Sequence, residues 1–303
     1  LPSTQPTTFS LRWTGFEEAG WTVASSFGPG SEARTINATP EEFRQSIFIA
    51  GALRCPTRRV HGNTIGVAIC GDDWRFSDDR FADLAAAVIG AERDFFADHT
   101  APWFLITLIP SGRFDGRGLS MGGTGLTNSF ALFCNTGLDL SPGSHHEQRI
   151  LHLLAHEHFH TWNGSRIHTA APEGSDYWFS EGFTDFYARR LLFRAGLSSA
   201  QTFADEHNQS LNSYFSSPVR AAPNERIAKE FWTSRELNQL PYDRGNLVAM
   251  AVDEQMRADS AGRRCLDDFM RDLLADSLAG RPPANSEALL ERIILASSNE
   301  GDV

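Results

Sequence analysis

Two histidines with helical spacing place the strongest constraint on how this chain folds. His156 and His160 are four residues apart, in a segment of helical periodicity that begins after Ser144. Residues i and i+4 lie on one face of a helix, so both imidazoles are able to bind one zinc ion, and Glu157 is able to reach a water at the same metal. This spacing predicts metal-assisted hydrolysis. The alternative is a histidine-rich, half-buried helix that matches the pattern by chance.

A catalytic zinc ion needs a third protein ligand, and the next predicted helix, residues 178–195, offers Glu181. Asp185 lies one helical turn later on the same face, where its carboxylate is able to accept the distal N–H of a zinc-bound histidine and fix the tautomer of the ring. Aromatic residues surround both acids in the sequence, and carboxylates in such surroundings are seldom left unpaired. We therefore expect a metal centre of His156, His160 and Glu181 rather than two solvated acids on a surface helix.

The composition excludes several other classes of protein. The chain has 303 residues, of which 41% are hydrophobic, and a formal net charge of -11. This length favours about two packed units. The apolar runs are shorter than the about 18 to 20 residues that span a membrane, so no membrane span is predicted. Basic residues are scattered and the balance is acidic, so nucleic acid is not expected as a partner.

The cysteines predict no metal chemistry of their own, because no two are close in sequence. They are Cys55, Cys70, Cys134 and Cys265. We expect buried free thiols, with a disulfide between Cys55 and Cys70 as the alternative. The first ten residues lack a signal-peptide pattern. We expect a soluble protein of a bacterial type of cell, and the choice between cytoplasm and periplasm stays open. The oligomeric state is also left open.

The pattern of elements divides the chain at about residue 72. Residues 1–72 are predicted to be a β-rich N-terminal part, and residues 73–303 a second domain with a sheet portion over about 73–143 and a helical portion over about 144–303. A capping box is predicted at Thr39. The predicted strands are 9–13, 21–27, 46–50, 64–70, 103–110 and 130–134, with an edge hairpin around the glycine-dense stretch 111–125. The predicted helices are 81–95, 145–162, 178–195, 199–215, 242–259, 264–276 and 285–297.

Three runs of residues resemble the glycyl aminopeptidase family of gluzincin zinc metallopeptidases. They are HEHFHTWN at 156–163, WFSEGFTDFY at 178–187 and PYDRG at 241–245, and the Trp-Asn after the second histidine is the most specific element. The segment 266–271 is also similar, so the resemblance covers about residues 9–278. Family members have a thermolysin-like catalytic domain, usually after an N-terminal β domain and often before a PDZ domain, and this chain looks like a fragment of such a protein.

The resemblance implies an α+β fold, in which a thermolysin-like zinc peptidase domain with a mixed sheet, an edge strand and a helical lobe follows a partial β-rich N-terminal domain. It implies one Zn²⁺ on His156, His160 and Glu181, with Glu157 as general base and Tyr242 as transition-state stabiliser. The implied reaction is hydrolysis of a peptide bond by a zinc-activated water, with aminopeptidase action as the family expectation and a peptide as the substrate.

One stretch departs from the family pattern. Family members carry Gly-Gly-Leu-Glu-His on the edge strand, and its glutamate is expected to hold the free amino terminus of the substrate. Here Gly122 and Gly123 match, but Gly125 stands where the glutamate is expected. The backbone near Gly122 and Gly123 is still able to pair with an extended peptide. Asp115 is the nearest acid that is able to replace the missing anchor.

The missing anchor leaves other functions open. An endopeptidase, or another gluzincin hydrolase such as one that opens epoxides, would use the same ligands, base and tyrosine. A catalytically inactive module that binds peptides would keep the cleft alone. Metal content and cleavage products distinguish these alternatives, and the sequence does not.

Overall fold

The structure is a computed structural model that describes residues 5–16, 18–114, 116, 119–170, 172, 174–282 and 286–297. Contacts between residues divide the chain into two units, Leu1–His158 and Phe159–Val303, so the dividing point falls near the end of one helix. The domain boundary predicted at residue 72 rests on strand patterns and stays a prediction. Asp115 lies outside the described residues.

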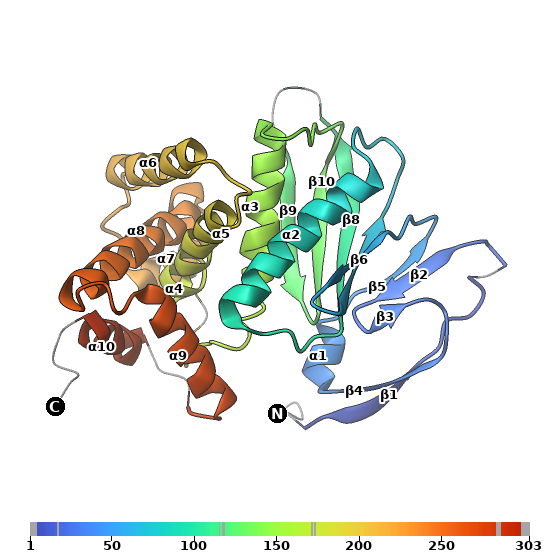
Figure 1. Ribbon diagram of the computed structural model, residues 1–303, viewed down its shortest axis with the longest axis horizontal. Helices are drawn as coiled ribbons and strands as arrows, with labels where there is room; N and C mark the ends of the chain where they lie inside the picture. Colours follow the sequence, from blue (N-terminus) through green and yellow to red (C-terminus); the bar gives the residue numbers. More distant parts are fainter. Residues whose placement is uncertain are drawn as a thin grey trace. The chain divides into compact units, whose positions relative to one another are not determined.

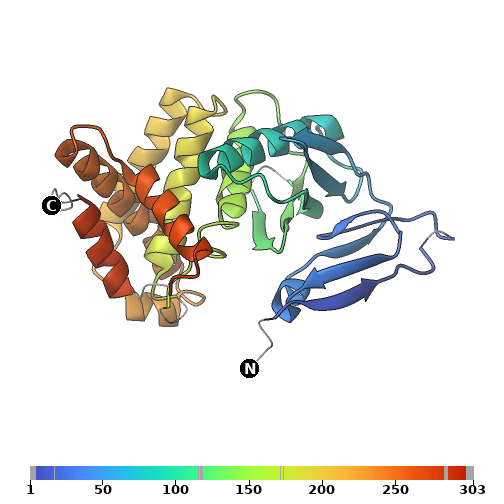
Figure 2. The same cartoon turned by 60° about the horizontal axis from the view of Figure 1, so that its bottom comes forward.

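Short antiparallel strands form the N-terminal part, as the turn-rich sequence predicts. They make a two-stranded sheet of β1 (Thr7–Leu11) with β4 (Arg34–Ala38), and a three-stranded sheet in the order β3 (Gly28–Pro29), β2 (Thr22–Ser25), β5 (Phe48–Gly51). Helix α1 (Pro40–Arg44) lies beside these strands (Figure 2). The backbone N–H of Glu42 donates to the hydroxyl of Thr39, and the N–H of Thr39 donates to the carboxylate of Glu42, which confirms the predicted capping box.

A mixed five-stranded sheet follows in the same unit (Figure 1). Its order is β6 (Thr57–Val60), β7 (Asn63–Ile69), β8 (Trp103–Arg113), β10 (Ser129–Thr136), β9 (Met121–Leu126). The three central strands are parallel, and β6 and β9 pair antiparallel at the two ends. β9 is therefore an edge strand of this sheet, which confirms the predicted edge hairpin.

Helix α2 (Asp78–Phe96) is the crossover that two parallel neighbouring strands, β7 and β8, require. It begins at Ser77, whose hydroxyl accepts the N–H of Arg80. Its buried apolar residues recur at helical spacing and confirm the predicted face. They are Phe81, Ala82, Leu84, Ala85, Val88, Ile89, Phe95 and Phe96.

Helix α3 (His145–Phe159) is fixed to α2 by a buried polar pair. Nδ1 of His158 lies 2.6 Å from a carboxylate oxygen of Glu92, and both side chains are almost fully buried. Burial raises the pKa of Glu92 well above its ordinary value and lowers the pKa of His158 to about 3. Burial therefore disfavours the charged form of each group, and the two side chains share one buried hydrogen bond. This bond sets the rotation of α3, the helix that carries the metal-binding pattern.

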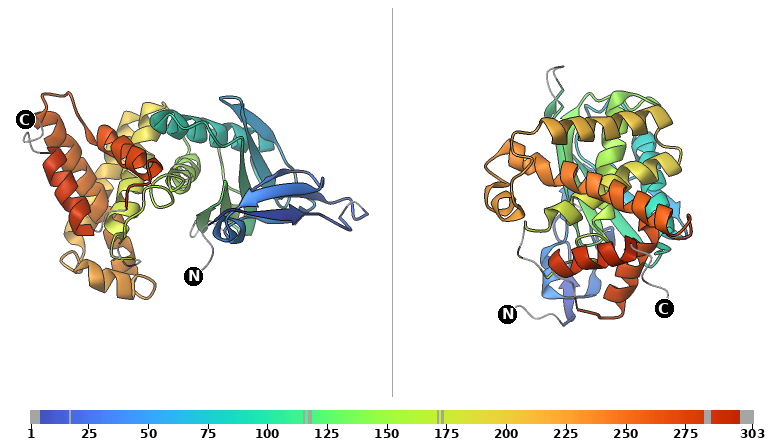
Figure 3. Two further views of the ribbon diagram at one scale, coloured as in Figure 1. Left: turned by 90° about the horizontal axis from the view of Figure 1, so that it is seen from below. Right: turned by 90° about the vertical axis from the view of Figure 1, so that its left-hand side faces the viewer.

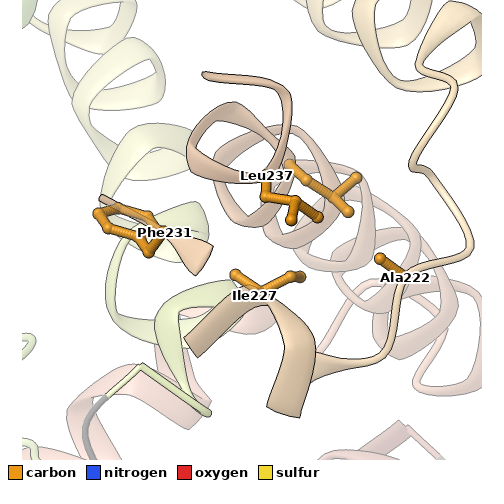
Figure 4. Close-up of a cluster of buried hydrophobic side chains, with 5 residues drawn as sticks. Ala222, Ile227, Phe231 and Leu237 are labelled. Carbon is orange, nitrogen blue, oxygen red and sulfur yellow. The ribbon is translucent and has the colours of Figure 1, made fainter. Parts of the chain in front are cut away.

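The second unit is helical in its described residues (Figure 1, Figure 3). Its helices are α4 (Tyr177–Ser180), α5 (Gly182–Arg194), α6 (Ala200–Ser216), α7 (Asn224–Glu230), α8 (Arg235–Asp259), α9 (Leu266–Leu278) and α10 (Ser286–Ser297). A cluster of buried apolar side chains packs α7 against the first turns of α8 (Figure 4). Its members are Ala222, Ile227, Phe231, Leu237 and Leu240. Among the described helices, none is long and apolar enough to cross a membrane.

Three predicted helices have clearly different bounds in the structure. The helix predicted over 145–162 ends at Phe159. The helix predicted over 178–195 is interrupted at Glu181, which separates α4 from α5. The helix predicted over 242–259 begins at Arg235 instead, because Ser234 caps it and Pro241 is accommodated inside its second turn. The sequence pattern does not predict the short elements β3, β4, β6 and α7.

The cysteines are free thiols, as expected. Cys134 is buried, and burial raises the pKa of its thiol to about 12. Cys55 is exposed, so the expectation of burial is wrong there. It comes just before the short strand β6, whose residues are only partly covered.

A buried ionic network joins three helices of the second unit. The carboxylate of Asp253 on α8 accepts from Arg190 of α5 at 2.7 Å, from Arg257 at 3.0 Å and from the backbone N–H of Leu266, the first residue of α9, at 2.9 Å. Burial raises the pKa of Asp253, but the bonds from the two arginines and from Leu266 lower it more, so that it lies below its ordinary value.

We expect Asp253→Asn to lower the free energy of unfolding by about 3 kcal/mol at pH 7, because it replaces the carboxylate beside the buried guanidinium of Arg190 with a neutral amide. The folded-state pKa of Asp253 is depressed, so its contribution is present above the unfolded-state pKa of about 3.9 and is lost as the pH falls through the folded-state value. Urea denaturation should therefore show the gap between wild type and variant narrowing from pH 5 to pH 3. The exposed Asp205→Asn on α6 is the control, and an equal effect of both variants would contradict a role for the network.

Candidate active site

The predicted metal-binding pattern lies at the end of α3. His156 is buried and Glu157 is half-buried, and both lie in the last turn of this helix. His160 directly follows Phe159, the last residue of α3. Helix α3 thus ends one residue before His160, whereas the sequence predicts a helix through residue 162.

The turn after α3 orients the ring of His160. Nδ1 of His160 lies 2.9 Å from the carbonyl oxygen of Asn163. A carbonyl only accepts hydrogen bonds, so Nδ1 carries the proton and Nε2 keeps its lone pair. That Nε2 lies 3.6 Å from a carboxylate oxygen of Glu181, and the two side chains are 19% and 18% exposed. A histidine nitrogen and a carboxylate oxygen thus face each other.

The side chain of Asn163 fixes the segment that carries Glu181. Asn163 is fully buried, and its Nδ2 donates to the carbonyl oxygens of Phe179 at 3.1 Å and Ser180 at 3.3 Å, and to the hydroxyl of Thr184 at 3.1 Å. These acceptors lie on both sides of the interruption between α4 and α5. One buried residue therefore holds the ring of His160 through its backbone and the turn of Glu181 through its side chain. In the sequence, this asparagine stands out only as part of the motif shared with the family.

Two glycines bring α8 against the same interruption. A Cβ on Gly245 would lie 1.7 Å from the carbonyl oxygen of Trp178, and a Cβ on Gly182 would lie 2.4 Å from Cα of Gly245. The backbones of the two segments are therefore in direct contact. Tyr242 comes three residues before Gly245 on α8, so this contact packs the turn of Tyr242 against the turn of Glu181.

We expect Gly245→Ala to destabilise the protein by about 3 kcal/mol, because the added methyl group meets a backbone carbonyl that is unable to move aside. Gly90→Ala in α2 is the matched control. Among the described residues, a Cβ there would contact only Cγ1 of Val60, at 3.5 Å, so alanine should stabilise the helix by about 0.5 to 1 kcal/mol. Urea denaturation of both variants tests the contrast. A neutral Gly245→Ala would show that the two segments are not in backbone contact.

The structure gives further partners for two predicted site residues. Asp185 is buried on α5, and its carboxylate lies 2.6 Å from a guanidinium nitrogen of Arg189. Tyr242 is half-buried and packs against the apolar cluster of α7 and α8. The roles predicted for both residues stay predictions.

The three glycines predicted to bind substrate lie on the edge strand β9. Gly122, Gly123 and Gly125 pair with Phe133, Leu132 and Phe130 of β10. A Cβ on Gly123 would lie 2.0 Å from the ring of Phe130, so glycine is required there, whereas a Cβ on Gly122 would meet no described residue within 4 Å. Gly125 is exposed and offers no acid.

Comparison with known proteins adds two findings. Residues 149–239 match the family model of the M61 glycyl aminopeptidases. The matched segment contains both His160 and Glu181. No curated protein sequence matches the chain.

The fold is similar to those of solved M1 peptidases. An aminopeptidase N family protein from Idiomarina loihiensis superposes with a TM-score of 0.75 at 18% identity, over 99% of this chain and 56% of that chain. An M1 zinc metallopeptidase from Deinococcus radiodurans gives a TM-score of 0.53 at 17% identity, over 97% and 58%. A mutant of that enzyme bound to a Tyr-Ser-Ala substrate gives 0.54 at 20% identity, over 97% and 61%. This chain spans less than two thirds of the length of each.

The mixed sheet, the helices and the N-terminal β-rich part are thus those of an M1-peptidase-like fold, which confirms the predicted fold class. The matched segment, residues 149–239, is similar to a family of peptidases. In its own motifs and in the matched segment, the chain resembles the M61 glycyl aminopeptidases.

Proposed function

We propose that the chain is a zinc-dependent metallopeptidase that cleaves peptides bound in extended conformation. The observation that carries the proposal is the pair of His160 and Glu181. Nε2 of His160 faces a carboxylate oxygen of Glu181 at 3.6 Å, while Nδ1 is held by the carbonyl of Asn163. Metal-bound histidines usually donate their second N–H in this way to a carbonyl or a carboxylate.

The residues present suit a zinc ion. His156, one helical turn before His160, His160 itself and Glu181 would supply two nitrogens and one oxygen, a donor set used by catalytic zinc sites that keep a fourth position open. When bound, zinc supplies Lewis acidity and lowers the pKa of a water ligand. We infer one zinc ion, and we assign Asp185 to the support of the ligands.

The other site residues carry the proton transfers. The carboxylate of Glu157 accepts a proton from the attacking water and returns it to the nitrogen of the leaving amine as the C–N bond breaks. The hydroxyl of Tyr242 donates a hydrogen bond to the carbonyl oxygen as negative charge develops there. The contact of Gly182 with Gly245 supports this role, since it joins the segment of Tyr242 to that of Glu181.

The edge strand β9 is where we place the substrate. An extended peptide would pair with its backbone near Gly122 and Gly123, which requires no side chain. The solved enzyme that binds Tyr-Ser-Ala supports a peptide as the substrate class. With glycine at position 125, no acid there holds the amino terminus, so we expect weaker discrimination between free and blocked peptides than the glycyl aminopeptidase pattern implies.

We expect Glu157→Gln to lower kcat/KM by at least about 100-fold and to leave bound zinc unchanged, because the amide is unable to accept the proton from water. Cleavage of a mixture of free and acetylated peptides, followed by mass spectrometry with a chelator control, measures the activity. Metal analysis measures the zinc. The exposed Glu254→Gln on α8 is the matched control and should keep full activity.

Each outcome of that experiment decides between functions. Removal of single residues from free peptides alone identifies an aminopeptidase that holds the amine by another group. Internal cleavage of acetylated peptides identifies an endopeptidase. If the wild type shows no chelator-sensitive cleavage, or if Glu157→Gln keeps its activity, the proposed hydrolysis is wrong, and a module that only binds peptides becomes the better description.

We expect Gly125→Glu to raise the preference for a free N-terminal glycine or alanine over the acetylated peptide by about 10-fold or more, because it restores a carboxylate beside the bound amine. The comparison of kcat/KM for the two peptides measures the preference. Gly125→Gln, which has the same size without the charge, separates electrostatics from bulk. An unchanged preference in Gly125→Glu would mean that the amine lies elsewhere.

A further inference from the structure

Two histidines and an aspartate that the proposed reaction does not use lie together in the first unit. His61 is in the turn between β6 and β7, Asp94 is in the last turn of α2, and His99 is in the segment between α2 and β8. The parallel pairing of β7 with β8 explains why they meet. The crossover through α2 returns the chain to the same end of the sheet at which β7 starts, and α2 lies beside β6 (Figure 1).

The ligand atoms of these three residues converge. Nε2 of His61 lies 2.8 Å and Nε2 of His99 lies 3.6 Å from the same carboxylate oxygen of Asp94, and one ligand atom from each residue lies within 4.8 Å of the others. In a tetrahedral zinc site with bonds of 2.0 to 2.2 Å, neighbouring ligand atoms are about 3.4 Å apart. The distance from Asp94 to His61 is below that value and the distance from Asp94 to His99 is above it. Small rotations of the side chains would therefore bring the ligand atoms to tetrahedral spacing.

Hydrogen bonding within the protein accounts for the contact of His61 with Asp94 but not for the approach of the His99 ring to the same carboxylate. The distance from His99 to Asp94 is too long for a hydrogen bond, and Nδ1 of the same ring has no hydrogen-bond partner in the described part of the chain. The two imidazole rings are nevertheless 4.2 Å apart, where two protonated rings would repel each other. A shared cation bound through the ring nitrogens would use both lone pairs.

The electrostatic setting also favours a cation. Asp94 lies at the C-terminal end of α2, where the helix dipole disfavours a carboxylate and favours positive charge. The side chains of His61, Asp94 and His99 are 43%, 59% and 36% exposed, so an ion from solvent is able to reach them.

The backbone holds the two histidines in place. His61 and Gly62 both have positive φ, at 49° and 82°, in a two-residue hairpin turn where asparagine or glycine is usual in the first position. The side-chain amide of Asn63 donates to the carbonyl oxygen of His99 at 2.6 Å and so ties the hairpin to the segment after α2. The donors are therefore positioned before any ion arrives.

We propose that His61, Asp94 and His99 bind a second divalent transition-metal ion, of which zinc is the expected one. Two imidazoles and one carboxylate select zinc, copper or nickel over magnesium and calcium, which prefer oxygen ligands. The ion would join the β6–β7 hairpin to the end of α2 and stabilise the fold without taking part in hydrolysis. This site is independent of the proposed metallopeptidase centre.

Calorimetric titration with zinc chloride tests the proposal, on full-length protein without a histidine tag. In the variant His156→Ala/His160→Ala, which disables the proposed catalytic centre, one equivalent of zinc should still bind. Adding His61→Asn and His99→Asn should weaken that binding at least 10-fold, and adding Asp94→Asn alone should weaken it too. The matched control adds His145→Asn and His168→Asn, two exposed histidines elsewhere, and should keep the equivalent. Circular dichroism verifies that each variant is folded.

The outcomes separate the two metal sites. If the variant with the disabled catalytic centre binds no zinc while the wild type binds one equivalent, the second site is overturned and the proposed function stands. If the wild type loses its only equivalent through His61→Asn/His99→Asn, the second site stands and the catalytic zinc is overturned. Equal zinc binding with and without His61 and His99 would also overturn the second site. A zinc-dependent rise in the unfolding temperature that disappears in Asp94→Asn would support it.

Discussion

A single buried asparagine determines the geometry of the proposed metal centre. The carbonyl of Asn163 sets the tautomer of His160, and its amide binds the backbone at the interruption between α4 and α5, where Glu181 lies. His160 and Glu181 come from separate elements, and the same buried residue thus contacts the ring of His160 and the backbone next to Glu181. A metal site depends on such support, because ligands that are free to rotate lose affinity and specificity for the ion.

The features that the sequence predicts well are those that depend on neighbours along the chain. The spacing of His156 and His160 predicts a shared helical face, and Thr39 predicts its capping box, because both patterns act within one helical turn. The apolar periodicity of α2 and the glycine-rich edge strand β9 follow from equally local rules. The fold class follows from these elements together with the family resemblance.

The features that the sequence does not predict depend on contacts between distant segments. The helix is interrupted at Glu181, where the buried amide of Asn163 binds the carbonyls of Phe179 and Ser180, and no periodicity reveals that contact. Helix α8 begins at Arg235, where Ser234 caps it, and it continues through Pro241. His61 and His99 have no ligand spacing in the sequence, since only the crossover between β7 and β8 brings them to one carboxylate.

The contact of Gly182 with Gly245 restricts how proteins of this architecture are able to diverge. Each glycine excludes a side chain because the other backbone occupies the space, so a substitution at either position is not rescued by a smaller residue at its partner. Many packed positions change over time through pairs of compensating substitutions. Gly182 and Gly245 are unable to change in this way. The segments of Glu181 and Tyr242 are therefore expected to be inherited as one unit, while an exposed helix such as α6 is free to accumulate changes.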